Sequence, residues 1–222
     1  AGQPAYRFGP FGDALPTTVD ISPFTNIASQ ALGDKAFVVN DLPGVAIFDY
    51  DRDGRLDIYI TQSEGNPNFL FRNEGDGTYE EVAREAGVDA IVSNSTGVVA
   101  CDFVIDGYQD LYVGAQGRIG DGLDFRAAGD DAGLREAVVD RLFVNNGDGT
   151  FRDITASAFG DAGNTRTAAS PACADVDLDG WLDIYVANRA DLDLFHTEGT
   201  SRGNLNVLYH NNGDLTFTEI AR

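Results

Sequence analysis

Several residue types are rare in this sequence. Its 222 residues include no methionine, one tryptophan, two histidines and two cysteines, and Lys35 is the only lysine. Few candidates therefore exist for a catalytic dyad, and no nucleophile-elbow motif occurs. Because position 1 is not methionine, we expect a processed, secreted chain from which a signal peptide has been removed. No apolar run approaches the roughly 20 residues of a membrane helix, so membrane insertion is not expected.

Positive charge is also scarce. The chain has 15 basic residues against 36 acidic residues, which gives a net charge of -21. Nucleic acids and anionic membranes bind basic surfaces, so neither is expected as a partner. Much of the acidic excess is clustered in Asp-rich loops, where a divalent cation would offset it. The remainder is typical of a solvated acidic surface.

Three segments share one pattern of Asp and Gly, namely DYDRDGRLDIYI from residue 49, DFVIDGYQDLYV from 102 and DVDLDGWLDIYV from 175. A strand-like segment precedes each Asp loop, and a second one (IYI, LYV or IYV) follows it. Each unit continues with an apolar strand, an Asn-Gly-Asp turn and another strand, as in RLFVNNGDGTFRDITA from 141. Gly and Asn favour tight hairpins. Each unit is therefore predicted to be a four-stranded antiparallel meander.

Such meanders stack on one another to bury their faces, which predicts an all-β fold, a β-propeller-like array in one domain over residues 1–222. The predicted blades cover about 44–83, 97–155 and 169–221, and the segment 1–43 adds a strand near 22–28. Propellers close with about four to eight blades. We therefore expect completion by other copies of the chain, by a partner chain or by sequence removed from this one, or else an open stack.

The Asp loops have the ligand spacing of a calcium site. Oxygen ligands at loop positions 1, 3, 5, 7 and 9, with Gly at position 6 for the turn, suit an ion that takes six to eight oxygens, whereas Mg²⁺ keeps more waters. The first loop would bind through Asp49, Asp51, Asp53, the Arg55 carbonyl and Asp57. The third would bind through Asp175, Asp177, Asp179, the Trp181 carbonyl and Asp183. Position 12 is not Glu and the flanks are strands, so this is no EF-hand.

The second loop departs from this pattern because Val104 replaces a carboxylate. Its remaining ligands would be Asp102, Asp106, the Tyr108 carbonyl and Asp110. We expect this loop to be weak or empty, and so predict two Ca²⁺ sites. Asp-rich turns that cap strands without a metal are the alternative, which applies most to the second loop.

The DxDxDGxxD loop between two strands, combined with the NNGDGTF turn, resembles the FG-GAP and VCBS repeat family, the calcium-loop blades also seen in integrin-type propellers. The resemblance covers nearly the whole chain from Phe24. It implies calcium-stabilised blades but no particular activity, because the family includes adhesion domains, lectin-like modules and non-catalytic parts of polysaccharide-degrading enzymes.

The two cysteines precede different Asp loops, Cys101 by one residue and Cys173 by two. On strands this offset places their side chains on opposite sheet faces. We therefore expect two buried free thiols and no disulfide. His210, just before an Asn-Gly-Asp turn, reads as an ordinary strand residue.

Two insertions, residues 118–139 and 188–204, are expected on the rim opposite the Asp loops. The first includes DDAGLREAVVDRL from 130, where Leu134, Val138 and Leu142 are spaced as in a short capped helix. The second contains Phe195 and His196. These insertions are either recognition loops or variable decoration.

We predict an extracellular, calcium-binding, non-catalytic module for adhesion or for binding a protein or glycan ligand. One alternative is a self-assembling extracellular structural protein whose blades are completed by other copies. The other is a calcium-dependent polysaccharide lyase or a fragment of one, although the acidic surface would repel an acidic polysaccharide.

Overall fold

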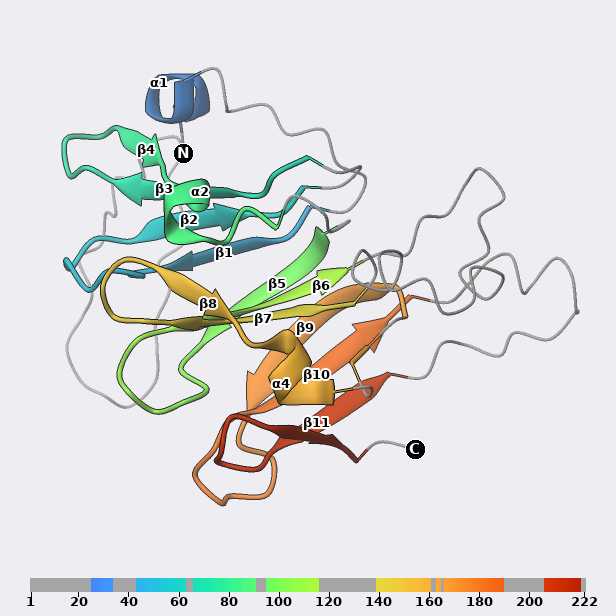
Figure 1. The fold of residues 1–222 in the computed structure, drawn as a ribbon. Coiled ribbons are helices and arrows are strands. Elements are labelled where there is room, and N and C mark those ends of the chain that lie inside the picture. Colours follow the sequence, from blue (N-terminus) through green and yellow to red (C-terminus); the bar gives the residue numbers. More distant parts are fainter. Residues whose placement is uncertain are drawn as a thin grey trace, which may run out of the picture.

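The computed structural model describes residues 25–33, 43–62, 66–90, 95–115, 139–160, 163–164, 166–189 and 206–220. The described chain forms three four-stranded antiparallel sheets, which confirms the predicted fold class (Figure 1). Blade 1 contains β1 (Val45–Phe48), β2 (Asp57–Ile60), β3 (Phe69–Asn73) and β4 (Tyr79–Glu81). Blade 2 contains β5 (Ser95–Cys101), β6 (Asp110–Ala115), β7 (Arg141–Asn145) and β8 (Phe151–Asp153). Blade 3 contains β9 (Ala168–Ala174), β10 (Asp183–Asn188), β11 (Val207–Asn211) and β12 (Phe217–Glu219).

Each blade is a meander in which neighbouring strands follow one another along the chain. The Asp loop joins the first two strands, because β1, β5 and β9 end just before it and β2, β6 and β10 begin at its last Asp. The Asn-Gly-Asp turn joins the third and fourth strands. The loop and the turn lie together at one rim, since the Arg55 Nε donates a hydrogen bond to the Asn73 carbonyl at 2.7 Å.

The blades stack in chain order, with one apolar core between each pair (Figure 1). Alternate residues of β6 serve both cores, because Leu111 and Val113 pack toward blade 1 while Tyr112 packs toward blade 3. A short helix after the fourth strand of blades 1 and 2 completes each core. Helix α2 (Ala83–Ala86) contributes to the first core and α4 (Thr155–Phe159) to the second.

The innermost strands of neighbouring blades approach too closely for side chains at two positions. A Cβ on Gly97 would stand 2.5 Å from the Ala169 carbonyl oxygen, and one on Gly44 would stand 2.4 Å from the Thr96 carbonyl oxygen. The Thr96 hydroxyl donates to the Ala168 carbonyl at 2.6 Å, which links β5 to β9. Glycine at these positions therefore permits the tight inner packing of the array.

The strand expected near 22–28 is not formed by the residues described there. Residues 25–27 have no regular structure, and Ala28 begins helix α1 (Ala28–Leu32). The residue before α1, Ile27, has φ -111° and ψ 9°, close to the values of Val82 before α2 and Ile154 before α4. Helix α1 thus matches the helix that follows a fourth strand, and it covers blade 1 from the side opposite α2 (Figure 1).

Cys101 and Cys173 form a disulfide with a Cα–Cα distance of 6.8 Å, so the expectation of two free thiols is wrong. The offset between the two positions does put their side chains on opposite sheet faces. They belong to different sheets, however, and the facing surfaces of two stacked sheets are opposite faces. The offset is therefore what brings the sulfur atoms together across the seam between blades 2 and 3.

Most of the two predicted insertions lies outside the described residues, including Phe195 and His196. Of the predicted helix over 130–142, the described part is not helical, because Leu142 lies in β7 and is buried in the second core. Its β-strand pairing with Tyr112 overrides the helical spacing. Among the described helices, none has the length and hydropathy needed to cross a membrane.

Candidate metal centres in the Asp loops

The three Asp loops share one hydrogen-bonded frame, here called loop 1 (residues 49–57), loop 2 (102–110) and loop 3 (175–183). In loop 1 the Asp49 carboxylate accepts from the backbone N–H groups of Asp53 at 3.0 Å and Gly54 at 2.9 Å. The first Asp of each other loop accepts the same pair of bonds, Asp102 from Asp106 and Gly107, and Asp175 from Asp179 and Gly180. The repeated sequence pattern therefore adopts the same hydrogen-bonded loop in all three blades.

The last Asp of each loop is completely buried. Asp57 accepts from the backbone N–H of Tyr50 at 3.1 Å and of Asn73 at 2.8 Å, so it joins its loop to the end of β3. Asp110 and Asp183 have equivalent bonds, to Phe103 and Asn145 and to Val176 and Asn211. The buried carboxylate therefore fixes the loop to the blade.

The fourth residue of each loop has a left-handed backbone although it is not glycine. Arg52, Ile105 and Leu178 have φ of 59°, 56° and 64°. Such a conformation costs on the order of 1 kcal/mol or more and is found where the surroundings enforce it, often at functional sites. The turn therefore has the same backbone shape in all three loops.

Carboxylate oxygens converge in loops 1 and 3. Asp49, Asp51 and Asp53 each offer a ligand atom within 4.8 Å of the others, and so do Asp175, Asp177 and Asp183. Two such charges about 4 Å apart repel by about 4 kcal/mol at an effective dielectric constant near 20. Part of this charge is offset by the Arg55 guanidinium, which pairs with Asp53. A divalent cation would offset the remainder.

Loop 2 differs in both ligands and charge. Its described residues do not form a comparable group of three converging carboxylates. In addition, the Arg52 guanidinium from loop 1 lies over the Tyr108 ring, 4.9 Å from its centroid. Val104 and this neighbouring positive charge both disfavour a cation there, so a weak or empty loop 2 stays a prediction.

Burial acts on the last Asp of loops 1 and 2. It raises the pKa of Asp57 to about 6 and that of Asp110 to about 7, although two backbone N–H donors oppose the rise in each case. Burial also raises the pKa of Asp51. A carboxylate whose charged form is unfavourable gains from a nearby cation, so Asp51 and Asp57 suit a metal-bound loop 1.

The donor set of loop 1 consists of oxygens, the ligands that Ca²⁺ prefers. The carbonyls of Arg55 and Trp181 remain predicted ligands. Their N–H groups donate to Asp53 and Asp179 at 2.9 Å, so these residues belong to the same turns. The residues present in loops 1 and 3 therefore fit Ca²⁺.

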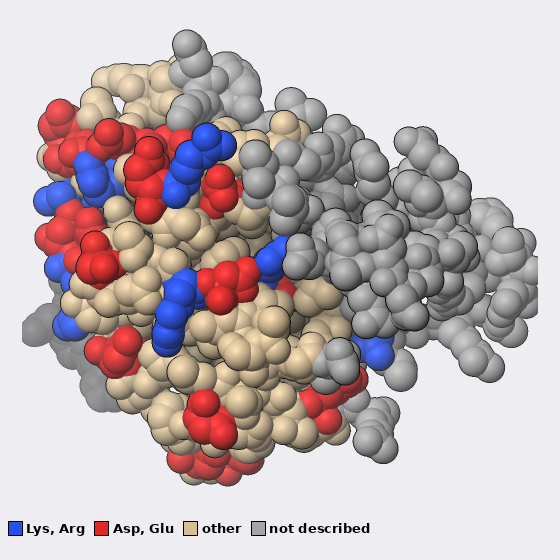
Figure 2. Space-filling model, in the orientation of Figure 1, with Lys and Arg blue, Asp and Glu red and all other residues tan. Residues whose placement is uncertain are grey.

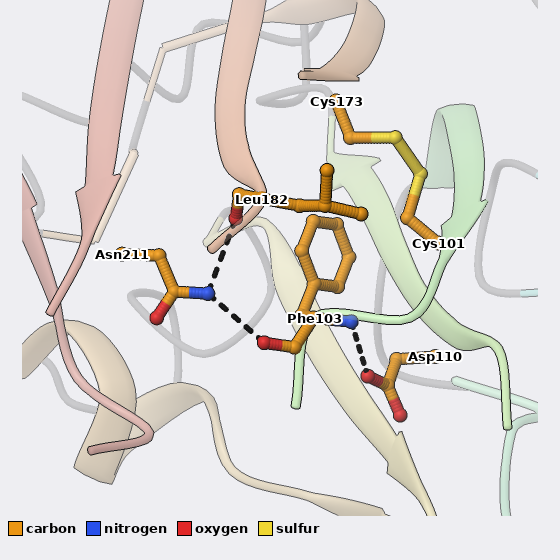
Figure 3. Close-up of a disulfide and its surroundings, with 6 residues drawn as sticks. All are labelled: Cys101, Phe103, Asp110, Cys173, Leu182 and Asn211. Carbon is orange, nitrogen blue, oxygen red and sulfur yellow. Dashed lines mark hydrogen bonds between the residues drawn. A yellow bond between two sulfur atoms is a disulfide. The ribbon is translucent and has the colours of Figure 1, made fainter. Parts of the chain in front are cut away.

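Loops 1 and 2 are also tied to the next blade, each by an Asn that the sequence patterns did not single out. The Asn145 Nδ2 donates to the Tyr50 carbonyl in loop 1 at 2.8 Å. The Asn211 Nδ2 donates to the Phe103 carbonyl in loop 2 at 3.0 Å and to the Leu182 carbonyl at 3.1 Å (Figure 3). The signal was the recurrence of Asn at the end of every third strand. The conformations of loops 1 and 2 are thereby coupled to the packing of each loop's blade against the next blade.

The surface beside loop 1 is strongly acidic. Acidic side chains gather over the blade 1 part of the face in Figure 2, with a few basic ones among them. A groove of about 550 Å³ lies between loop 1 and the turn of blade 2, and its acidic lining residues are Asp51, Asp53, Glu80, Glu81, Glu85 and Asp148, with Arg72 as the basic one. This charge disfavours an acidic ligand.

The FG-GAP-like repeat family matches residues 49–113 and 120–186, which together make up more than half of the chain. The chain belongs to this family. The matched residues include all three Asp loops and leave out β1, β11 and β12. The family resemblance inferred from the loop and turn motifs is therefore confirmed.

Cartilage acidic protein 1 from Xenopus tropicalis is 31% identical over 150 residues, which cover 66% of this chain and 20% of that protein. The Homo sapiens protein of that name is 32% identical over 131 residues, 58% of this chain and 16% of that protein. The chain thus spans about a fifth of these relatives. A solved Agrocybe aegerita lectin structure, titled for recognition of non-reducing terminal N-acetylglucosamine, matches with 17% identity and a TM-score of 0.43, covering 81% of this chain and 37% of that one.

Proposed function

We propose that this chain is a calcium-binding, non-catalytic module of an extracellular protein, in which Ca²⁺ in loops 1 and 3 orders the rim of the array for adhesion or for binding a protein or glycan. The observation that carries the proposal is the convergence of carboxylates in these two loops. Bound calcium would neutralise that charge. The Asn145 bond to Tyr50 would then transmit the order of loop 1 to the next blade.

Three further observations support this function. Disulfides persist in oxidising compartments, so the Cys101–Cys173 bond favours an extracellular location. The acidic groove beside loop 1 disfavours an acidic polysaccharide, the substrate class considered for a lyase. The histidine of the described chain, His210, faces loop carboxylates at 3.3 and 3.4 Å rather than completing a dyad with a nucleophile.

Calcium titration should show two bound ions per chain. Asp51→Asn should remove the site in loop 1, whereas Asp106→Asn in loop 2 serves as the matched control and should leave two. Trp181 is the single tryptophan and lies in loop 3, so its fluorescence should respond to calcium in the wild type and in Asp51→Asn alike. At a free calcium concentration of about 100 times Kd, each site should stabilise the fold by about 2.7 kcal/mol. Isothermal titration that detects no calcium uptake would refute the proposal.

A second function, assembly, is favoured by the outer face of blade 1. Val45 and Ile47 alternate with core residues along β1 and are 54% and 62% exposed. They pair with Ile60 and Ile58 of β2, so apolar side chains adjoin one another on that face. On the far side of the array, Tyr185 of β10 is 42% exposed. We propose that copies of this chain cover these end faces.

Light scattering should therefore detect a multimer in calcium that dissociates when a chelator loosens the loops. Ile47→Asp should prevent assembly because it places a charge on the apolar face. Ile105→Asp is the matched control, since Ile105 is exposed to a similar extent but lies in loop 2. A wild type that stays monomeric with and without calcium would contradict assembly, while leaving calcium binding untouched.

A further inference from the structure

Blade 3 carries a histidine beside its Asp loop, at a position where the other blades have different residues. Asn73, Asn145 and Asn211 occupy equivalent places, because each donates its backbone N–H to the last Asp of its own loop. The preceding residues, Arg72, Val144 and His210, are therefore equivalent as well. Loop 3 thus has an imidazole neighbour where loop 1 has a guanidinium and loop 2 an aliphatic side chain.

The imidazole is directed at the loop carboxylates. The His210 Nδ1 lies 3.4 Å from the Asp177 Oδ2 and 3.3 Å from the Asp183 Oδ1. Its Nε2 lies 4.0 Å from the Asp179 Oδ2. Asp177, Asp179 and His210 form a group whose ligand atoms are all within 4.8 Å of one another, and Asp177 also belongs to the group with Asp175 and Asp183.

Hydrogen bonding does not account for this arrangement. The Nδ1 atom is buried and has no hydrogen-bond partner in the described part of the chain, although the side chain as a whole is 26% exposed. Two atoms bound to one metal ion at about 2.1 Å stand roughly 3.0 to 3.4 Å apart and off each other's bonding axis. The contacts of Nδ1 with Asp177 and Asp183 have the spacing of ligands that share an ion.

We propose that His210 makes loop 3 a mixed nitrogen and oxygen site for a borderline divalent ion such as Zn²⁺, bound by the His210 Nδ1 and the carboxylates of Asp177 and Asp183. Asp179 lies 4.0 Å from Nε2, beyond hydrogen-bonding distance, so its carboxylate adds negative charge beside the ring without orienting it. Asp177 is about half exposed, which leaves room for water at the ion. The inference rests on the proposed function only in that loop 3 binds a divalent cation.

The two metal loops would then differ in selectivity. Ca²⁺ takes oxygen ligands, whereas imidazole nitrogen favours zinc and neighbouring transition ions. Loop 1 offers carboxylates next to Arg72, whose side chain is paired with Glu74 and Glu80. Zn²⁺ should therefore compete with Ca²⁺ for Asp177 and Asp183 in loop 3 while leaving calcium in loop 1.

The test is titration of the calcium-free full chain with Zn²⁺ alone, followed by calorimetry and by Trp181 fluorescence. His210→Val should weaken zinc binding at loop 3 by roughly 100-fold or more and leave calcium binding at loop 1 unchanged. Valine is suitable because Val144 occupies the equivalent place in β7. His196→Gln controls for the other histidine, and Asp51→Asn controls for loop 1. Both should keep the wild-type zinc affinity.

A spectroscopic measurement keeps the proposal testable if His210→Val fails to fold. Pulsed electron paramagnetic resonance of the Cu²⁺-loaded His196→Gln chain should detect nitrogen coupling from one imidazole. Equal zinc affinity in the wild type and His210→Val, or no imidazole coupling, would overturn the proposal. A wild-type chain that takes up calcium but does not bind zinc would refute only this inference. A wild-type chain that binds zinc but takes up no calcium would refute only the proposed function.

Discussion

Reduction of the Cys101–Cys173 disulfide will lower the free energy of unfolding by about 4 kcal/mol. The two cysteines are 72 residues apart, and a cross-link that closes a loop of this length restricts the unfolded chain by about that amount in the chain-entropy model. In the folded state the bond joins β5 to β9, the inner strands of blades 2 and 3 (Figure 3). Urea unfolding in saturating calcium, with and without reductant, measures the effect.

The matched control is the double variant Cys101→Ser and Cys173→Ser. It should unfold at the lower urea concentration of the reduced wild type, and reductant should not change that concentration. Hydrogen exchange should increase mainly in blades 2 and 3, because the bond spans their seam. An unfolding midpoint that is the same for the oxidised and reduced protein would contradict the prediction.

Asp140→Asn will change how stability depends on pH. Asp140 is 1% exposed and accepts hydrogen bonds from the Tyr112 hydroxyl, the Asn164 amide and the Ala115 backbone N–H, each at 2.7 Å. Burial nevertheless raises the pKa of Asp140 to about 7. A charge is therefore buried here at neutral pH, and its three partners do not fully compensate for the lost hydration.

Blades 1 and 3 use an amide at the same place. Asn68 accepts from the Gln62 backbone N–H at 2.7 Å and donates to the Tyr59 hydroxyl at 2.8 Å. Asn206 likewise accepts from a backbone N–H of its blade and donates to the Tyr185 hydroxyl. The blade geometry thus accommodates asparagine. Asp140→Asn requires that the Tyr112 hydroxyl reorient and that the Asn164 amide turn away from its bonds with Asn188 and Arg166.

The direction of the effect follows from proton binding. Since the folded pKa of Asp140 lies above its unfolded value near 4, the folded chain holds more protons between pH 4 and 7, and wild-type stability falls as pH rises through this window. The loss is about 1.4 kcal/mol per pH unit, or on the order of 4 kcal/mol in all. Asp140→Asn lacks this loss. Its free energy of unfolding should therefore rise relative to that of the wild type as pH rises from 5 to 8.

Thermal and urea unfolding at several pH values, compared between the wild type and Asp140→Asn, checks the prediction. The titration of the loop carboxylates is common to both chains and cancels in the difference. Asp148→Asn, an exposed turn substitution, is the control and should keep the wild-type profile. Parallel pH profiles for the wild type and Asp140→Asn would contradict the prediction.

The blade pattern could be predicted because it repeats. Each Asp loop is followed by two strands and then by a turn with Asn and Gly. Three aligned copies of this pattern separate the shared signal from chance. The same alignment defined the carboxylates of loops 1 and 3, since ligand spacing within one loop is a local property of sequence. Local geometry and its repetition account for most of the fold and for the candidate metal ligands.

Contacts between blades could not be predicted in the same way. The Cys101–Cys173 bond depends on which faces of two sheets meet, and treating both residues as members of one sheet led to the wrong conclusion. Asn145 and Asn211 bond across seams between residues about 100 positions apart. The nearness of His210 to Asp177 likewise depends on the packing of β11 against loop 3.

The start of the array shows how a real signal can be assigned to the wrong element. The segment FTNIAS aligns with the fourth strands, but its described residues form the approach to helix α1. The aromatic-led pattern ends in Ile27, equivalent to Val82 and Ile154, and a short helix follows each of these. The resemblance of FTNIAS to the fourth strands decided the prediction, whereas packing of the small residues after Ile27 against blade 1 favours the helix.

Counting the bound calcium ions is the most direct test of the central claim. Native mass spectrometry of the full chain, exchanged into calcium and kept free of zinc, resolves the number of ions per chain. The converging carboxylates of loops 1 and 3, and their weaker counterpart in loop 2, predict two ions in the wild type and one in Asp51→Asn. A chain that retains no calcium, or that loses none with Asp51→Asn, would contradict the assignment of these loops as metal centres.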